Sequence, residues 1–224
     1  MSDRPESSPS SPAHAPLAMM LSLADSRLPV GGHVHSGGVE QAIADGFIRT
    51  ATDLADFLYR RVTTSGLVAA SAAAAVADGA LEVGAAQREV NARTPSAAAR
   101  KASLAQGRGM VRLARRMFPD HDWTVHRPAT HLPVISGSIG AASSLSGFHT
   151  ALILVYTTMS GSAAAGQRLL ALDPADVSIM IADLGAECER VAAEAAVGLA
   201  DLSDPVLDIF AERHERQSMP LFMS

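Results

Sequence analysis

The sequence is poor in cysteine and in aromatic residues. Cys188 is the single cysteine among 224 residues, so no intramolecular disulfide can form, which is typical of a reducing compartment such as the cytoplasm. Aromatic residues make up 4% of a chain that is 48% hydrophobic. Because alanine supplies much of the hydrophobic share, we expect closely packed helices rather than aromatic-rich sheets.

The sequence also lacks a secretory signal and a membrane span. Residues 1–16 are rich in Ser and Pro and show no basic segment followed by an apolar one, so we interpret them as a disordered tail. Residues 128–167 contain no Asp, Glu, Lys or Arg, but Pro133 and many Ser and Gly interrupt them. A membrane helix needs about 20 mostly apolar residues. We therefore expect a buried soluble hairpin here and no contact with a membrane.

The charges are unevenly divided along the chain. Residues 1–116 hold 13 Arg/Lys against 10 Asp/Glu, a balance of +3, whereas residues 117–224 hold 5 against 13, a balance of −8. The overall charge of −5 argues against a general nucleic-acid binder. Residues 93–116 contain seven basic residues and no acidic one. They are interpreted as a solvated helix face, with a docking strip for an acidic partner or a nucleic-acid contact as alternatives.

Hydrophobic periodicity predicts an all-α fold. Apolar residues recur at spacings of three and four, no stretch alternates apolar and polar residues with β-branched enrichment, and no Asn-Gly hairpin signal occurs. We predict a single domain, residues 17–224, of about nine or ten packed helices. Capping residues are predicted at Ser36, Thr52, Thr94, Ser146, Asp173 and Asp204.

Two apolar stripes give sharper expectations. Residues 39–47 predict a helix that carries Phe47 on its apolar face. Beyond Asp173-Pro174, a long amphipathic stripe includes Cys188, which we therefore interpret as a small buried hydrophobe and not a nucleophile. The stripe consists of Val177, Ile181, Leu184, Cys188, Val191 and Ala195.

Residues 28–40, LPVGGHVHSGGVE, form a glycine-rich connection between two helical segments. Four glycines and one proline predict a tight, shaped loop. A sharp turn between packed helices and a functional loop both fit this composition. A phosphate cradle fits less well, because the chain has no G-x-x-x-x-G-K-[ST] and no strand precedes the glycines.

His33 and His35 lie two residues apart in this loop and are the candidates for a metal site. Imidazole suits Zn, Cu and Ni, but two ligands are too few for tight binding, and no third ligand is evident nearby. The chain has no H-E-x-x-H, no cysteine cluster and no G-x-S-x-G, so we predict no catalytic residue. A binding protein is favoured. The alternatives are a metal-dependent enzyme using this histidine pair, or a small adaptor.

Four segments resemble the UreF family of urease accessory proteins. The first is Leu28-Pro29-Val30-Gly31-Gly32 with Ser36, Gly38 and Glu40; the second is the basic helix with Arg100, Ser103 and Gln106-Gly107. The third is Arg168-Leu169-Leu170, and the fourth is Arg213-His214-Glu215 with the terminal Leu221-Phe222. Their order and spacing carry the resemblance.

The chain also departs from the family pattern. His33 stands where an aromatic residue is usual, and Ser36-Gly37-Gly38 stands for Ser-Gln-Gly. Ala171-Leu172-Asp173-Pro174 replaces Pro-Leu-Gly-Gln, and Met219 stands where the tail usually has tyrosine. Contacts that those side chains make in other members are not carried over.

The resemblance implies an all-α accessory protein without catalysis or a cofactor of its own. Such a protein bridges the urease apoprotein, UreD (also called UreH) and the GTPase UreG, promotes nickel insertion and regulates GTP hydrolysis. It also implies a homodimer. We expect Leu221 and Phe222 to be exposed tail residues that anchor a partner. The partner-binding residues expected are Leu28, Pro29, Val30, Gly31, Gly32, Ser36, Gly38, Glu40, Arg168, Arg213, His214, Glu215, Leu221 and Phe222.

Overall fold

The computed structural model describes residues 16–25, 28, 35–127, 129–201, 204–216 and 221–222. Within these ranges the regular structure is eleven α-helical segments and one π-helical turn, without a strand, so the all-α prediction is confirmed. The segments are α1 (Pro16–Leu23), α2 (Val39–Ala44), α3 (Ala51–Arg61), η2 (Val62–Gly66), α4 (Leu67–Ala77), α5 (Val83–Arg93), α6 (Ala97–Met117), α7 (Leu132–Ala142), α8 (Gly147–Leu170), α9 (Pro174–Asp183), α10 (Gly185–Ala195) and α11 (Pro205–His214).

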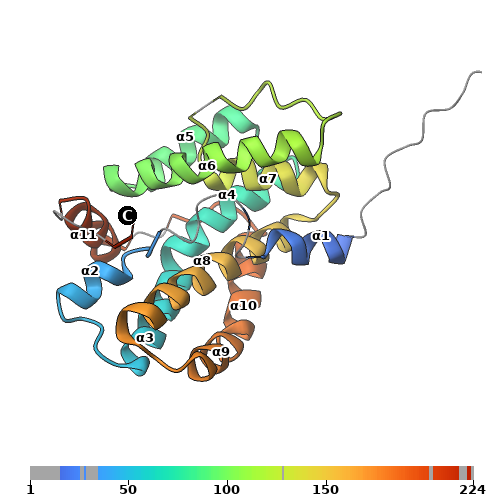
Figure 1. Ribbon diagram of the computed structural model, residues 1–224. Helices are drawn as coiled ribbons and strands as arrows, with labels where there is room; N and C mark the ends of the chain where they lie inside the picture. The colour runs from blue at the N-terminus through green and yellow to red at the C-terminus, as the bar shows by residue number, and fades with distance from the viewer. Residues whose placement is uncertain are drawn as a thin grey trace, which may run out of the picture.

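Helix α4 runs through the middle of the molecule and is covered by α7, α8 and α10 (Figure 1). Its sequence, LVAASAAAAVA, presents almost only small apolar side chains, and eight of its eleven residues are buried. Small side chains let the neighbouring helices approach closely. At Gly137 of α7, for example, a Cβ would lie 2.6 Å from the Ala73 carbonyl oxygen. The alanine-rich composition thus produces a tightly packed centre.

The segments α3, η2 and α4 follow one another without a break. The π-helical turn lies where the Ser65-Gly66 pair is found, so the helix changes its winding there instead of ending. A Cβ on Gly66 would lie 3.0 Å from the Arg61 carbonyl oxygen. Single π-helical turns inside α-helices occur frequently at functional sites.

The remaining helices form two sides and one end. Helices α5, α6 and α7 lie on one side of α4 and α9 and α10 lie on the other, whereas α3 continues α4 at its N-terminal end (Figure 1). Helices α2 and α11 pack together at one end of the molecule. None of the helices in the described ranges is both long and apolar enough to cross a membrane.

Three predicted caps are correct and three are wrong. Ser146, Asp173 and Asp204 accept hydrogen bonds from the first turns of α8, α9 and α11. Thr50, not Thr52, caps α3, because Asp53 completes a reciprocal capping box with Thr50. The position three residues after Thr52 is occupied by alanine, which cannot complete such a box.

The other two cap corrections concern the starts of α6 and α2. Ser96, not Thr94, caps α6: its hydroxyl accepts from the Ala99 N–H and also donates to Glu212 of α11. Helix α2 begins after Gly38, which has a φ of 92°, and no side chain caps it. The Ser36 hydroxyl is buried and has no hydrogen-bond partner among the residues that the structure describes.

Two stripe predictions also needed revision. The apolar stripe beyond Asp173 is divided at Leu184 into α9 and α10. Phe47 lies beyond the end of α2 and is 64% exposed, although its ring edge contacts the Phe210 ring with centroids 5.3 Å apart. Cys188 is buried as predicted, and burial raises the pKa of its thiol to about 11.

Candidate functional site

The Glu40 carboxylate joins three segments that are far apart in the sequence. It accepts a hydrogen bond of 2.8 Å from His214 Nε2 of α11. It also accepts from the backbone N–H groups of Leu221 at 2.8 Å and Phe222 at 3.0 Å. The chain end thus lies against the first turn of α2. We call Glu40, His214, Leu221, Phe222 and Arg168 the Glu40 cluster.

The Glu40 carboxylate is buried, yet it stays ionised because its acceptors are satisfied. Burial alone raises its pKa, but the hydrogen bond from His214 and those from Leu221 and Phe222 outweigh burial and lower it. His214 is almost completely buried beside it. A carboxylate that accepts three N–H donors in a buried setting fixes the positions of all three, since breaking any one leaves an unpaired polar atom.

Arg168 at the end of α8 completes the cluster. Its guanidinium carbon lies 4.8 Å from the centre of the Phe222 ring, a cation–π contact. The expectation that Phe222 is exposed is wrong: its side chain is buried between Arg168 and the Glu40 region, with 9% of its surface accessible. Leu221 is 79% exposed, as expected. One of the two tail residues is therefore an internal anchor, and the other faces outward.

The residues Arg213, His214 and Glu215 at the end of α11 each contact a different residue elsewhere in the chain. Arg213 forms a 2.9 Å ion pair with Asp45, just past α2, whereas Glu215 pairs with Lys101 of α6. His214, between them, reaches Glu40. Arg213 and Glu215 thus connect α11 to the end of α2 and to α6, next to the Glu40 cluster in sequence.

The glycine-rich loop is only partly described. Pro29, Val30, Gly31, Gly32 and His33 lie outside the described residues, and Leu28 is half-buried. His35 and Ser36 are buried. Gly37 and Gly38 have φ values of 64° and 92°, a conformation that favours glycine, and the Gly37 carbonyl accepts a 2.7 Å hydrogen bond from Arg61.

The structure therefore brings together the predicted residues Glu40, Arg168, His214, Leu221 and Phe222. Sequence reasoning did not find Asp45, Lys101 or Arg61, which hold the neighbouring segments. Each is one charged residue in an ordinary amphipathic helix or turn, so its neighbours in the sequence do not distinguish it from other charged residues. Its role is recognised only from the partner that it contacts, which is distant in the sequence.

A buried histidine outside the cluster, His131, has a structural role. His131 lies at the start of α7, with Nδ1 3.0 Å from the Ser103 hydroxyl and Nε2 2.9 Å from the Asn91 side-chain oxygen, and burial lowers its pKa to about 4. Within the part of the chain that the structure describes, no three His, Cys, Asp or Glu side chains are grouped so as to hold a metal ion.

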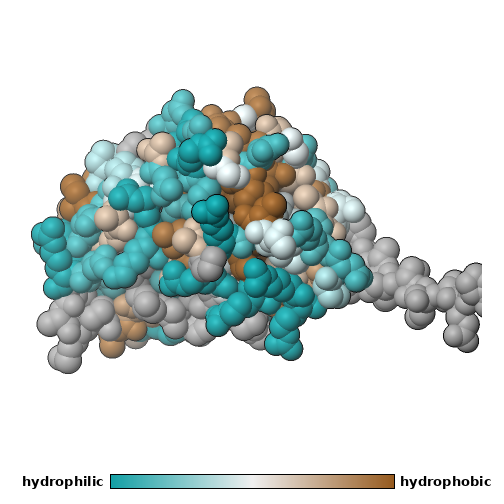
Figure 2. All heavy atoms as spheres, turned by 90° about the horizontal axis from the view of Figure 1, so that it is seen from above, coloured by the Kyte–Doolittle hydropathy of each residue, from teal (hydrophilic) through white to brown (hydrophobic). Residues whose placement is uncertain are grey.

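The basic stretch forms one exposed face of α6. Arg108, Arg112, Arg115 and Arg116 are exposed, whereas Lys101 pairs with Glu215. Figure 2 looks onto the side of α5, α6 and α7 and shows hydrophilic residues over much of this face, around one hydrophobic patch. The solvated-face interpretation fits this exposure, and the docking-strip alternative stays a prediction.

Comparison with known proteins gives concordant matches. The family model for UreF matches residues 48–185. The urease accessory protein UreF of Mycobacterium sp. (strain JLS) is 59% identical to this chain over 208 residues, which cover 93% of this chain and 99% of that protein. The UreF proteins of Mycobacterium tuberculosis (strain ATCC 25618 / H37Rv) and Mycobacterium marinum (strain ATCC BAA-535 / M) are 57% and 56% identical, with the same coverage.

Proposed function

The chain belongs to the UreF family of urease accessory proteins, and we propose that within urease maturation it acts as a non-catalytic scaffold. The scaffold bridges the urease apoprotein, UreD (UreH) and the GTPase UreG. Nickel is handled by the assembled complex, and GTP is bound by UreG, so this chain needs no cofactor. We further propose that it works in the cytoplasm as a homodimer.

The observation that carries this proposal is the Glu40 cluster. Its internal contacts hold the backbone at Leu221 in one position while 79% of the Leu221 side chain remains exposed. An apolar side chain on a fixed backbone is suited to bind a pocket of a partner, because little conformational freedom is lost on binding. We therefore assign the contact with UreD to the surface around Leu221.

The bridging role also predicts that this surface is used together with others. The exposed arginines of α6 carry positive charge that would attract an acidic partner. We propose that UreD and the other partners contact separate faces. A single chain can then hold two partners at once.

The test is co-expression of this chain with the urease subunits, UreD and UreG, followed by affinity purification and a urease assay with added nickel. We expect wild-type chain to co-purify with UreD and to restore urease activity in a strain that lacks it. Deletion of residues 217–224 should weaken UreD binding while circular dichroism shows unchanged helicity.

A matched pair of point variants sharpens the test. Leu221→Asp should reduce the UreD recovered, whereas Ile179→Asp, which changes a 60% exposed residue on α9, should not. Equal recovery with both variants would place the UreD contact elsewhere. Normal urease activity in the strain without this chain would contradict the maturation role itself.

A further inference from the structure

Arg61 is a largely enclosed cation that lacks an anionic partner in the described part of the chain. Its Nη1 donates one hydrogen bond, to the Gly37 carbonyl, and its Nε is buried without an acceptor among the described residues. Arg60, by contrast, pairs with Asp204 through two hydrogen bonds of 2.5 and 2.7 Å. Burial lowers the pKa of Arg61 to about 10, so the guanidinium is still charged at neutral pH.

Arg61 as a whole is half-buried, but its Nε is fully buried, and a buried donor on a charged guanidinium is unfavourable unless an acceptor binds it. The edge formed by Nε and Nη2 is the one that makes no hydrogen bond within the described residues. In other proteins this edge binds the two oxygens of a carboxylate side by side.

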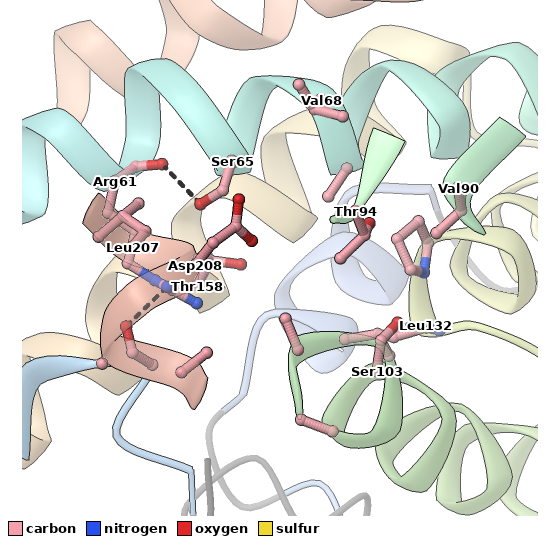
Figure 3. Close-up of a pocket in the computed structure, with 18 of the residues that line it drawn as sticks. Arg61, Ser65, Val68, Val90, Thr94, Ser103, Leu132, Thr158, Leu207 and Asp208 are labelled. Atoms are coloured by element: carbon pink, nitrogen blue, oxygen red, sulfur yellow. Dashed lines mark hydrogen bonds between the residues drawn. The ribbon is translucent and has the colours of Figure 1, made fainter. Parts of the chain in front are cut away.

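Two cavities meet at Arg61, of about 220 and 510 Å³, and both are also lined by Gly37, Gln106 and Thr158. Figure 3 shows Arg61 at one side of the smaller cavity, with Ser65, Thr158 and Asp208 around it. Asp208 lines only the smaller cavity. The larger cavity has Arg61 and Arg168 among its lining residues, and a single acidic residue, Asp25.

Helix α8 lines the larger cavity with five hydroxyl-bearing residues, Tyr156, Thr157, Thr158, Ser160 and Ser162, of which two matter here. Ser162 and Thr158 line it, and neither hydroxyl makes a hydrogen bond to another described residue. The Ser160 hydroxyl lines it too, but donates to the Thr157 carbonyl at 3.5 Å. A Cβ on Gly37 would lie 2.7 Å from both Arg61 Cζ and Ser162 Oγ, so the glycine leaves room for the guanidinium and the hydroxyl to converge.

We propose that the larger cavity binds a small planar monoanion, bicarbonate or a short carboxylate, held by the Arg61 guanidinium and the Ser162 and Thr158 hydroxyls. We propose a monoanion because Arg61 supplies one positive charge to the cavity, whereas the Arg168 guanidinium already contacts the Phe222 ring. The planar fork matches two coplanar oxygens. This binding site goes beyond the scaffold function and does not depend on it.

The experiment is isothermal titration calorimetry on the full purified chain with sodium bicarbonate, formate and acetate, each at constant ionic strength, with phosphate and chloride as comparisons. We expect saturable binding of at least one planar monoanion. Arg61→Gln should weaken it about tenfold or more, because charge-assisted hydrogen bonds are lost. Arg112→Gln, which removes an exposed charge on α6, should leave it unchanged.

A second pair keeps the test decisive if Arg61→Gln does not fold. Ser162→Ala should weaken binding about threefold to tenfold, because one neutral hydrogen bond is lost. Ser160→Ala, on the same wall of the cavity, should have little effect. The proposal is overturned if no planar monoanion gives saturable binding, if phosphate binds more tightly than all of them, or if Ser162→Ala and Ser160→Ala are equivalent.

Discussion

The centre of this molecule and the end that holds α11 are stabilised in different ways. Around α4, the buried residues are mostly alanine, valine and leucine, and stability comes from close packing. Helix α11 also packs Leu207 and Phe210 into the hydrophobic core, but it is held in addition by charged and hydrogen-bonding side chains in and next to it. These link Asp204 to Arg60, Glu212 to Ser96, Arg213 to Asp45, His214 to Glu40 and Glu215 to Lys101.

The difference has a physical consequence. Apolar packing is insensitive to pH and to moderate salt, whereas ion pairs and buried carboxylates respond to both. The end with α11 is therefore expected to open locally under conditions that leave the centre folded. The end with α11, which can open locally, therefore lies at the surface around Leu221 that we assign to a partner.

The largest expected effect comes from a substitution in the centre. Gly137→Ala places a Cβ 2.6 Å from the Ala73 carbonyl oxygen and from Val76 Cβ, so α7 must move away from α4. Overpacking of this kind destabilises by about 1–3 kcal/mol. Urea unfolding followed by circular dichroism measures the change in the free energy of unfolding.

The matched control is Gly161→Ala in α8, where a Cβ meets nothing within 4 Å. Replacing this helical glycine should leave stability unchanged or raise it by up to about 1 kcal/mol, because alanine favours the helix. If both glycine variants lost equal stability, close approach of α7 and α4 would not be what stabilises the centre.

The next effect is expected at the Glu40 cluster. Glu40→Gln removes the charge and one of the acceptors that His214, Leu221 and Phe222 use. Because these donors are buried, we expect a local loss of about 2 kcal/mol. Hydrogen exchange should quicken over residues 204–222 but not over α4, whereas Glu189→Gln on the exposed face of α10 should change neither. A uniform increase over the whole chain would contradict a local role.

Acid pH should separate the two regions without any substitution. The pKa of Glu40 lies below its ordinary value of 4.5 in the folded chain. The stabilisation is therefore fully present above pH 4.5 and is lost as the pH falls through the folded-state pKa. Amide exchange in α11, measured relative to α4 in the same sample, should rise across this window. In Glu40→Gln the rise should be smaller, and an equal rise would assign the effect to other carboxylates.

The smallest effect is expected for the outer ion pair of α11. The Arg213 side chain is 56% exposed, so water screens its 2.9 Å contact with Asp45. Arg213→Gln should cost about 0.2–1 kcal/mol and less at high salt. A loss as large as that of Glu40→Gln would mean that the Arg213–Asp45 pair contributes as much as the Glu40 carboxylate to holding this end together.

How much could be predicted from the sequence depends on whether a feature is set by neighbouring residues or by residues distant in the sequence. Cap-plus-proline starts at Asp173 and Asp204 depend on neighbouring residues alone, and both are correct. The cap at Thr50 was also available locally, through Asp53 three residues on. The Ser96 cap was harder to predict from neighbouring residues, because the Ser96 hydroxyl also donates to Glu212, more than a hundred residues away.

The candidate site shows the same division. The family motifs drew attention to Glu40, Arg168, His214 and Phe222 separately, but not to their convergence on one carboxylate. Apolar composition near the chain end suggested that Phe222 is exposed, whereas the structure buries it under Arg168. Apolar character is a property of the residue, but its exposure depends on which segments pack around it.

Helix content, the small-residue centre and the burial of Cys188 were determined by the sequence itself, because periodicity and residue size act between neighbours along one helix. The uncompensated Arg61, the three donors around Glu40 and the division of the apolar stripe at Leu184 were decided only by the tertiary structure. Whether a charged side chain has an ionic partner, and whether a carboxylate accepts hydrogen bonds, depends on segments that are distant in the sequence and meet only in the folded chain.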